Sequence, residues 1–187
     1  MSTGTDLVAA NTHRAAYPLG QRPGASVVAN SAPGEYLSMR LGGEEYAIEI
    51  LKVQEIRSYE EPTHIANASN CVRGVLNLRG NIVPVMDLHQ LFDLPPIEVG
   101  ASTVTIVLNL DNQTVGVVAD AVNDVVELRE QDIKPTPGFS GAIKSSHITG
   151  IGTLRNSFDE SRMLILIDVQ ELLSRAGVLS GAESQAA

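Results

Sequence analysis

The residue types that most often catalyse reactions or bind metals are scattered along this chain. The four histidines are His13, His64, His89 and His147. None of them stands at metal-ligand spacing from a cysteine, an aspartate or a glutamate, so the sequence predicts no zinc or iron site. Ser145-Ser146-His147 places a nucleophile type beside a base type, but adjacent residues point in different directions and seldom form a catalytic triad. We therefore expect neither a metal site nor a nucleophilic active site.

Two aspartates could form a carboxylate pair for acid–base catalysis, but their contexts favour another role. Asp87 and Asp168 each directly precede apolar residues spaced i, i+3, i+4, where an aspartate usually caps a helix. Gly42-Gly43 and Arg79-Gly80 lead into strands, so neither is a phosphate-binding loop at a helix start. Cys71 begins an apolar stretch, where a free thiol behaves as a small hydrophobic side chain. The sequence thus predicts no cofactor and no enzyme.

The charge and composition of the chain exclude several classes of partner. The net charge is −9, from 13 Lys+Arg against 22 Asp+Glu, which repels nucleic-acid phosphates and anionic lipid head groups. A single cysteine rules out an intrachain disulfide and favours a reducing compartment. No apolar run approaches the roughly 20 residues that a membrane-spanning helix needs, and the N-terminus lacks the order of a signal peptide. We expect a cytoplasmic protein that binds no nucleic acid and does not insert into a membrane.

Short strands between two flexible tails must position any functional residue. Hydrophobic residues make up 43% of the chain but aromatic residues only 4%, so we expect an aliphatic, β-branched core, which favours sheet. Residues 1–34 and 175–187 are rich in small residues, and we expect them to be flexible tails around a domain of residues 35–174. Alternating segments predict a hairpin at Gly42-Gly43 and another at Arg79-Gly80. We expect one short helix after Asp87 and another after Asp168, so that the second helix lies near the C-terminus.

The second half of this domain repeats the plan of the first. Tyr46 is followed seven residues later by Val53, and Val115 is followed seven residues later by Val122. In both halves a glycine, a Leu-Arg pair, an apolar strand and a capping aspartate then follow in the same order. The duplication predicts two similar β-barrels of about five strands each, packed together and arranged either in tandem or interleaved.

An arginine stands at one of the predicted turns, between two apolar strands. Gly80 would allow the positive φ that a two-residue hairpin turn requires, which leaves the Arg79 guanidinium projecting from the turn. Arg79 then either binds a partner's carboxylate or pairs with an internal acid such as Glu55, and the sequence leaves both alternatives open. Gly74 and Gly150, which begin the repeated order in the two halves, are assigned structural roles together with Gly80.

Two stretches of the chain closely resemble the CheW family of chemotaxis coupling proteins. They are Glu45–Arg57, which reads EYAIEILKVQEIR, and Arg73–Leu88, which reads RGVLNLRGNIVPVMDL. The likeness continues in the family's order over about residues 35–174. It implies an all-β fold of two SH3-like five-stranded barrels that binds the regulatory domain of the histidine kinase CheA and the cytoplasmic tip of methyl-accepting chemoreceptors.

The resemblance also assigns binding residues. Receptor-binding positions would be Val53, Glu55, Arg57 and Arg79, and kinase-binding positions would be Val104, Val122 and Val125. The expected function is a non-enzymatic adaptor, recruited to membrane receptor arrays through its partners. Two alternatives stay open: a coupling protein of a related chemosensory system, such as one that drives twitching pili, and a small β-barrel enzyme or ligand-binding protein with its site at the seam between the barrels.

Overall fold

The computed structural model describes residues 31–111, 113–136, 147–155 and 161–179 and confirms an all-β fold. The strands are β1 (Gly34–Leu41), β2 (Glu44–Glu49), β3 (Val53–Ser58), β4 (Val72–Leu78), β5 (Asn81–Asp87), β6 (Val104–Leu110), β7 (Gln113–Ala119), β8 (Ala121–Leu128), β9 (Ile133–Lys134), β10 (Ile148–Arg155) and β11 (Ser161–Ile167). The short helices are α1 (Leu88–Leu91) and α2 (Val169–Arg175), with 3-10 turns η1 (Ile50–Lys52) and η2 (Glu130–Asp132). Most of both predicted tails, His13 and Ser145-Ser146 lie outside the described residues.

Two-residue turns close the hairpins that the sequence predicts. β1 and β2 pair antiparallel around Gly42-Gly43, and β4 and β5 pair antiparallel around Arg79-Gly80. Arg79 and Gly80 both have positive φ, 54° and 92°, and positive φ at both positions is the mark of a type I′ turn, whose twist matches that of the strands. In the sequence Ile50 continues the apolar alternation of Tyr46 and Ile48, but in the structure it begins η1, where the chain leaves the sheet.

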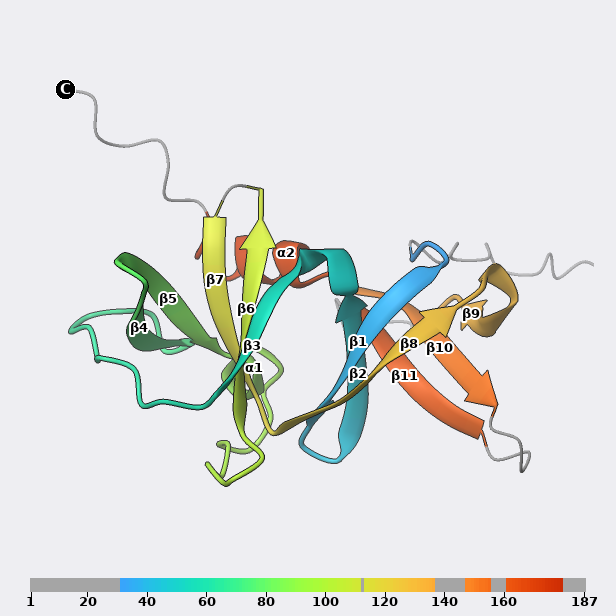
Figure 1. Cartoon of the computed structure of the whole chain (residues 1–187), viewed down its shortest axis with the longest axis horizontal. Helices are drawn as coiled ribbons and strands as arrows, with labels where there is room; N and C mark the ends of the chain where they lie inside the picture. The colour runs from blue at the N-terminus through green and yellow to red at the C-terminus, as the bar shows by residue number, and fades with distance from the viewer. Residues whose placement is uncertain (1–30, 112, 137–146, 156–160, 180–187) are drawn as a thin grey trace, which may run out of the picture.

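Each of the two sheets takes strands from both halves of the chain (Figure 1). The strand order is β8-β1-β2-β11-β10-β9 in one sheet and β3-β6-β7-β5-β4 in the other. The β1–β2 hairpin therefore lies with strands of the second half, and β6–β7 lies with strands of the first. Between the two alternatives left open by the sequence, the repeat is interleaved. The chain crosses between the sheets through η1, at the top of the junction in Figure 1, and through Asp120 between β7 and β8, at the bottom.

The register shows the internal repeat at the level of residue pairs. Ala47 in β2 pairs in parallel with Leu166 in β11, and Gly116 in β7 pairs in parallel with Val85 in β5. Ala47 and Gly116 follow Tyr46 and Val115, the positions that the sequence aligns. The order β8-β1-β2-β11-β10 corresponds to β3-β6-β7-β5-β4, and the two-residue β9 is added at one edge. Thus one sheet has the five strands expected and the other has one short strand more.

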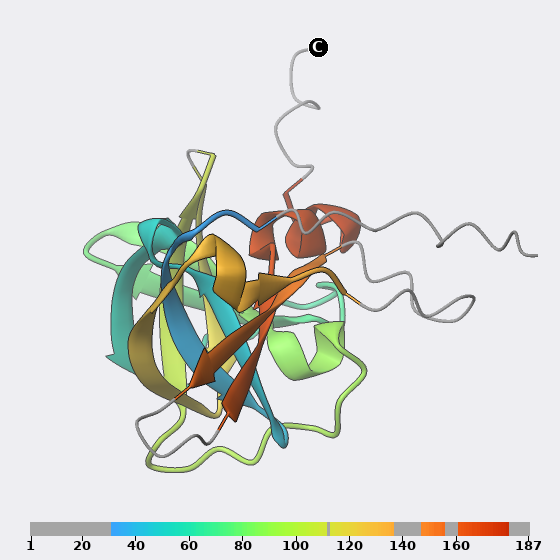
Figure 2. The ribbon, with the colours of Figure 1, turned by 90° about the vertical axis from the view of Figure 1, so that its right-hand side faces the viewer.

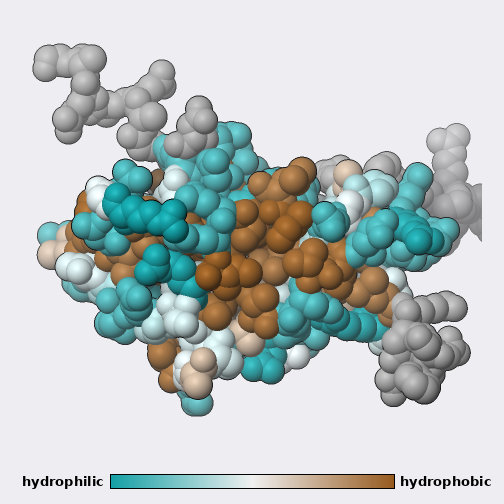
Figure 3. Space-filling view, in the orientation of Figure 1, coloured by the Kyte–Doolittle hydropathy of each residue, from teal (hydrophilic) through white to brown (hydrophobic). Residues whose placement is uncertain are grey.

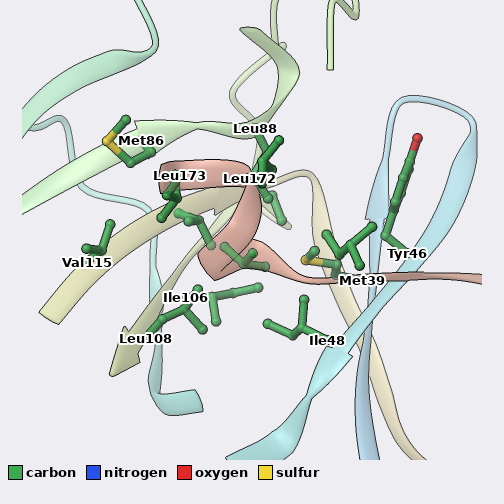
Figure 4. Packing of buried hydrophobic residues seen from close by; sticks show 14 of the residues in the cluster. Met39, Tyr46, Ile48, Met86, Leu88, Ile106, Leu108, Val115, Leu172 and Leu173 are labelled. Carbon is green, nitrogen blue, oxygen red and sulfur yellow. The ribbon is translucent and has the colours of Figure 1, made fainter. Parts of the chain in front are cut away.

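The largest buried cluster lies between the two sheets and belongs to both (Figure 4). Its members include Leu37, Met39, Leu41, Tyr46, Ile48, Met86, Leu88, Ile106, Leu108, Leu110, Val115, Val117, Leu172 and Leu173. Each sheet covers a smaller cluster of its own, around Leu164 and Leu166 in the six-stranded sheet and around Val83 and Val107 in the other. Because the main cluster is shared, separating the sheets would expose most of the apolar core to water.

Each helix begins at the aspartate that the sequence assigns as its cap. The Asp87 carboxylate accepts hydrogen bonds from two backbone N–H groups of α1, and Asp168 makes the same pair of bonds at α2. Both helices lie on the side of the molecule opposite to β3 and β8 (Figure 2). Beyond residue 174, Val178 and Leu179 pack against the main cluster, and the domain limits of 35 and 174 stay a prediction. None of the helices in the described part of the chain is long and apolar enough to cross a membrane.

Candidate functional site

Three of the residues expected to bind a receptor lie on one face of the edge strand β3. Val53, Glu55 and Arg57 alternate along β3 and are half-buried, while the residues between them are exposed. The Glu55 carboxylate lies 3.6 Å from Arg57 Nη1 and 3.4 Å from Arg79 Nη2. Arg57 also pairs with Glu60 at 3.5 Å. The structure therefore joins Glu55, Arg57 and Arg79 in one ion-pair cluster, with Val53 at the start of the same strand.

The pair between Arg79 and Glu55 connects opposite edges of one sheet. β3 and β4 are the two edge strands of the five-stranded sheet, and Arg79 lies in the turn after β4, so its side chain reaches from that turn to the edge strand on the other side of the sheet. The Arg79 side chain is 83% exposed, and an ion pair so exposed contributes at most about 1 kcal/mol. Of the two alternatives for Arg79, the free protein has the internal pair, which is weak enough to be exchanged for a partner's carboxylate.

The three valines expected to bind the kinase do not share one sheet. Val104 begins β6, whereas Val122 and Val125 lie on β8, an edge strand of the six-stranded sheet. Val104 and Val122 are half-buried against the main cluster, and Val125 is 50% exposed. Val125 is therefore the most accessible of the three.

An apolar patch at the η1 crossover was missed in the sequence. Leu51 is 93% exposed, and with its half-buried neighbour Ile50 it lines a hollow of about 390 Å³ beside the start of β1. Figure 3 shows hydrophobic surface running across the middle of this face, over the crossover and β8. Leu51 interrupts the alternation of Tyr46, Ile48 and Ile50, and this extra apolar residue is the signal from which the patch could have been found.

A polar network holds β8 to its own sheet. Arg162 on β11 donates to the Asp124 carboxylate at 2.8 and 2.9 Å and to the Ser38 hydroxyl at 2.7 Å, and it also pairs with Glu45. Asn123 donates to Glu45 at 3.1 Å. The hydrogen bond from Arg162 holds the pKa of the Asp124 carboxyl below its usual value. The strand that carries Val125 is thus fixed by side chains from three other strands.

The buried polar side chains of the described residues lie on several different elements of the fold. Asp87 caps α1 and pairs with Arg73 at 3.0 Å, and Thr103 accepts a bond from a loop N–H group. Burial lowers the pKa of His147, whose ring packs against Phe92 at 5.2 Å between centroids. In the part of the chain that the structure describes, no group of three or more His, Cys, Asp or Glu side chains is placed to hold a metal ion.

Comparison with known proteins gives one consistent result. The family model of the CheW-like domain matches residues 35–177. The "Chemotaxis protein CheW" of Klebsiella aerogenes is 46% identical over 140 residues, which cover 75% of this chain and 81% of the relative. The protein of the same name in Bacillus subtilis is 30% identical over 146 residues, 78% of this chain and 90% of the relative.

A solved structure agrees with these relatives. The crystal structure of the scaffolding protein TtCheW from Thermoanaerobacter tengcongensis superposes with a TM-score of 0.66 at 26% sequence identity. The match covers 76% of this chain and 89% of the other.

Proposed function

The chain belongs to the CheW-like domain family of chemotaxis scaffold proteins, which are not enzymes, and on this premise we propose that it couples methyl-accepting chemoreceptors to the histidine kinase CheA. The observation that carries the proposal is the ion-pair cluster of half-buried Glu55 and Arg57 on β3 with exposed Arg79 in the β4–β5 turn, together with the exposed Leu51 in η1, the turn that leads into β3. In this proposal the chain uses no cofactor and is recruited to membrane receptor arrays through its two partners.

The receptor surface comprises η1, β3 and the β4–β5 turn. A receptor tip presents helices, and a helix docks through apolar anchors flanked by charges that fix its orientation. Leu51 and Val53 would supply the apolar contacts, and Glu55, Arg57 and Arg79 would supply the charges. The 93% exposure of Leu51 supports this assignment, because a large apolar side chain within a hydrophobic patch often marks an interaction site.

The kinase surface is the edge strand β8 around Val125. One side of an edge strand has unpaired backbone groups and is a template for another β-strand. The resemblance gives the kinase's regulatory domain the same fold, so it has strands to offer to such an edge. The bonds from Arg162 to Asp124 keep β8 in place in the free protein, which reduces the ordering cost of binding.

Exchanging charges between Arg79 and Glu55 tests the receptor surface. Arg79→Glu should weaken binding to a purified receptor tip by about 2 kcal/mol, roughly 30-fold, as interface arginines often do. The melting temperature should change little because Arg79 is 83% exposed. In the double variant Arg79→Glu with Glu55→Arg, the internal pair returns but the charge pattern offered to the receptor is reversed, so binding should stay weak. If the double variant bound normally, Arg79 would act only inside the chain.

Arg79→Asn is the matched control for the turn. Asparagine adopts the positive φ of a type I′ turn readily, so this variant keeps the hairpin while it removes the guanidinium. We expect weak receptor binding with an unchanged or slightly higher melting temperature, measured by titration calorimetry and by thermal unfolding of the full chain. Normal binding by Arg79→Asn would count against a contact through the guanidinium.

A lysine on the exposed edge tests the kinase surface. Val125→Lys should weaken binding to the kinase's regulatory domain by at least about tenfold, because it places a charge in an apolar contact, and should leave receptor binding unchanged. Met163→Lys is the control, since Met163 is also exposed, at 66%, on β11 of the same sheet. Equal losses in both variants would show a general effect of charge, and no loss in Val125→Lys would remove β8 from the proposal.

A further inference from the structure

A lysine ties the η1 crossover to the C-terminal helix. Lys52, the last residue of η1, has its Nζ 3.2 Å from Asp168 Oδ1 and 3.7 Å from Glu49 Oε2. The same Asp168 oxygen accepts hydrogen bonds of 3.0 and 3.3 Å from the backbone N–H groups of Gln170 and Glu171, at the start of α2. One carboxylate oxygen therefore joins the crossover between the sheets to the first turn of α2.

The helix α2 is a firm anchor, whereas η1 has few contacts of its own. Leu172 and Leu173 of α2 are buried in the main cluster. By contrast, η1 has no buried residue, no side-chain hydrogen bond caps its start, and a backbone bond from Val53 N–H to Ile50 O closes its turn. The orientation of η1 therefore depends on what its side chains contact outside the turn.

The three side chains of η1 point in three different directions, because a 3-10 helix has three residues per turn. Ile50 packs against the main cluster and Lys52 reaches Asp168. Leu51 is left to face the solvent, with 93% exposure. Once partners fix two of the three directions, the third direction is fixed as well. The exposed position of Leu51 is thus a consequence of the contacts that its two neighbours make.

We propose that Lys52 is a positioning residue, whose pair with Asp168 holds η1 in the orientation that projects Leu51 from the surface. This role rests on the proposed function, in which Leu51 and Val53 are apolar contacts of the receptor surface. Without the pair, η1 would sample orientations in which Leu51 is partly withdrawn from water, because contact between water and an apolar side chain is unfavourable. Receptor binding would then include the ordering of this turn and would be weaker.

The internal repeat shows that a helix cap can be paired with a cation without involving a crossover. Asp87, the cap of α1, pairs at 3.0 Å with Arg73 of β4, which lies in the same sheet as the strand before α1. In the second half the residue before Gly150 is Thr149, where the first half has Arg73 before Gly74. The cation at the cap of α2 comes instead from η1, so this pair fixes the crossover as well as the cap.

The second crossover lacks both features of the first. When Val53 is aligned with Val122, the places of Leu51 and Lys52 are taken by Asp120 and Ala121. The lysine is therefore present in the crossover that carries the exposed leucine and absent from the crossover that does not. This agreement is expected if the lysine serves to position the leucine.

Two substitutions that break the pair from opposite sides test the proposal. Lys52→Met keeps the aliphatic stem and removes the ammonium group, whereas Asp168→Asn keeps a good helix cap and removes the charge that attracts the ammonium. Each should weaken binding of the full chain to a purified receptor tip about fivefold in titration calorimetry, and leave binding to the kinase's regulatory domain unchanged. The double variant should lose no more than either single variant, because both remove the same interaction.

The pair of variants separates positioning from other roles of the lysine. The two substitutions shift the net charge in opposite directions, so a loss in both cannot come from overall charge. If Lys52 contacted the receptor itself, Asp168→Asn would free its ammonium group, and binding would stay the same or become tighter. That outcome would overturn the proposal.

Three controls accompany these measurements. Lys52→Arg keeps a cation and should bind the receptor tip more tightly than Lys52→Met does. Lys134→Met removes another lysine, exposed on β9, and should bind as the wild type does. The melting temperature of each variant should change by no more than about 3 °C, because both side chains of the pair are partly exposed. A larger drop for Lys52→Met would give the lysine a role in global stability and count against the proposal.

Backbone relaxation measured by NMR on the free chain tests the positioning without any partner. The order parameter of the Leu51 amide should fall from about 0.85, typical of a rigid backbone, toward about 0.6 in Lys52→Met, while the amides of β8 stay unchanged. An unchanged order parameter at Leu51 would contradict the proposal even if binding were weaker. If the wild type does not bind a receptor tip, the proposed function fails, and the order of Leu51 still decides whether Lys52 holds the crossover.

Discussion

At the scale of single residues, the cost of the backbone conformation of Arg79 can be distinguished from the role of its charge. Its φ of 54° is unfavourable for a residue other than glycine, asparagine or aspartate, yet an arginine stands there. The weak pair with Glu55 does not offset that cost by itself, since so exposed an ion pair contributes little. A binding role for the guanidinium would explain the choice of residue, and the swap with Glu55 tests that role directly.

Thr105 has a buried hydroxyl without a hydrogen-bond partner among the described residues. It lies on β6 and is 1% exposed. Replacing the hydroxyl by a methyl group removes an unsatisfied polar atom, so Thr105→Val should raise the free energy of unfolding by about 1 kcal/mol, measured by urea denaturation.

Thr103 provides the matched control for that prediction. It is 3% exposed, but its hydroxyl accepts a hydrogen bond of 2.9 Å from Gly100 N–H. Thr103→Val should therefore destabilise the protein by about 1 kcal/mol, because it leaves that N–H group unpaired. Similar effects of both substitutions would contradict the account of Thr105.

At the scale of elements, the hairpins and helix starts follow from local chemistry. The covering of an edge strand depends instead on contacts with segments distant in the sequence. The edge strand β4 is partly covered by the segment after β3, where Thr63 and Val75 exchange two backbone hydrogen bonds of 2.9 Å. Gly74 lies beneath this contact with φ of 151°, and a Cβ there would come within 2.3 Å of Thr63 O. The glycine allows the covering segment to approach the strand.

Gly74→Ala should therefore be strongly destabilising. The added methyl group must displace the backbone of Thr63, so we expect a loss of about 2–4 kcal/mol in the free energy of unfolding. Gly80→Ala is the comparison: its φ of 92° is also positive, but a Cβ there meets nothing within 4 Å, so the loss should stay near 1 kcal/mol. A cost for Gly74→Ala no larger than that for Gly80→Ala would argue against the close approach.

At the scale of the whole molecule, the interleaved strands make each half depend on the other. β1 and β2 pair with β8 and β11, and β3 and β5 pair with β6 and β7. When the two halves of the sequence are separated, only the hairpins β1–β2, β4–β5 and β6–β7 and the β10–β11 hairpin with the two-residue β9 at its edge remain, and an isolated hairpin is barely stable in water. The shared main cluster would also be divided.

Cutting the chain in the loop before β6 tests this dependence. Fragments 1–97 and 98–187 should each lack cooperative unfolding, whereas an equimolar mixture should recover the circular dichroism and the cooperative transition of the intact chain, because each supplies the other's missing strands. Cooperative folding of either fragment alone would mean that the halves are independent and that the interleaved pairing is not required.

The sequence by itself determined the features that depend on residues close together in the chain. The turns at Gly42-Gly43 and Arg79-Gly80, the caps at Asp87 and Asp168 and the buried Cys71 were all predicted and are present, because each depends on a few neighbouring residues. The repeat and the family resemblance were also legible, since both are patterns in the order of residues.

Only the tertiary structure decided which distant groups meet. The interleaving of the strands, the exposure of Leu51, the pair of Arg79 with Glu55 and the contact of His89 with Asp120 all join positions whose approach depends on how the sheets are assembled. Tandem and interleaved arrangements satisfy the same local patterns and differ only in long-range pairing. Residue spacing therefore cannot distinguish the tandem arrangement from the interleaved one. The burial of one large apolar cluster between the two sheets favours the interleaved arrangement.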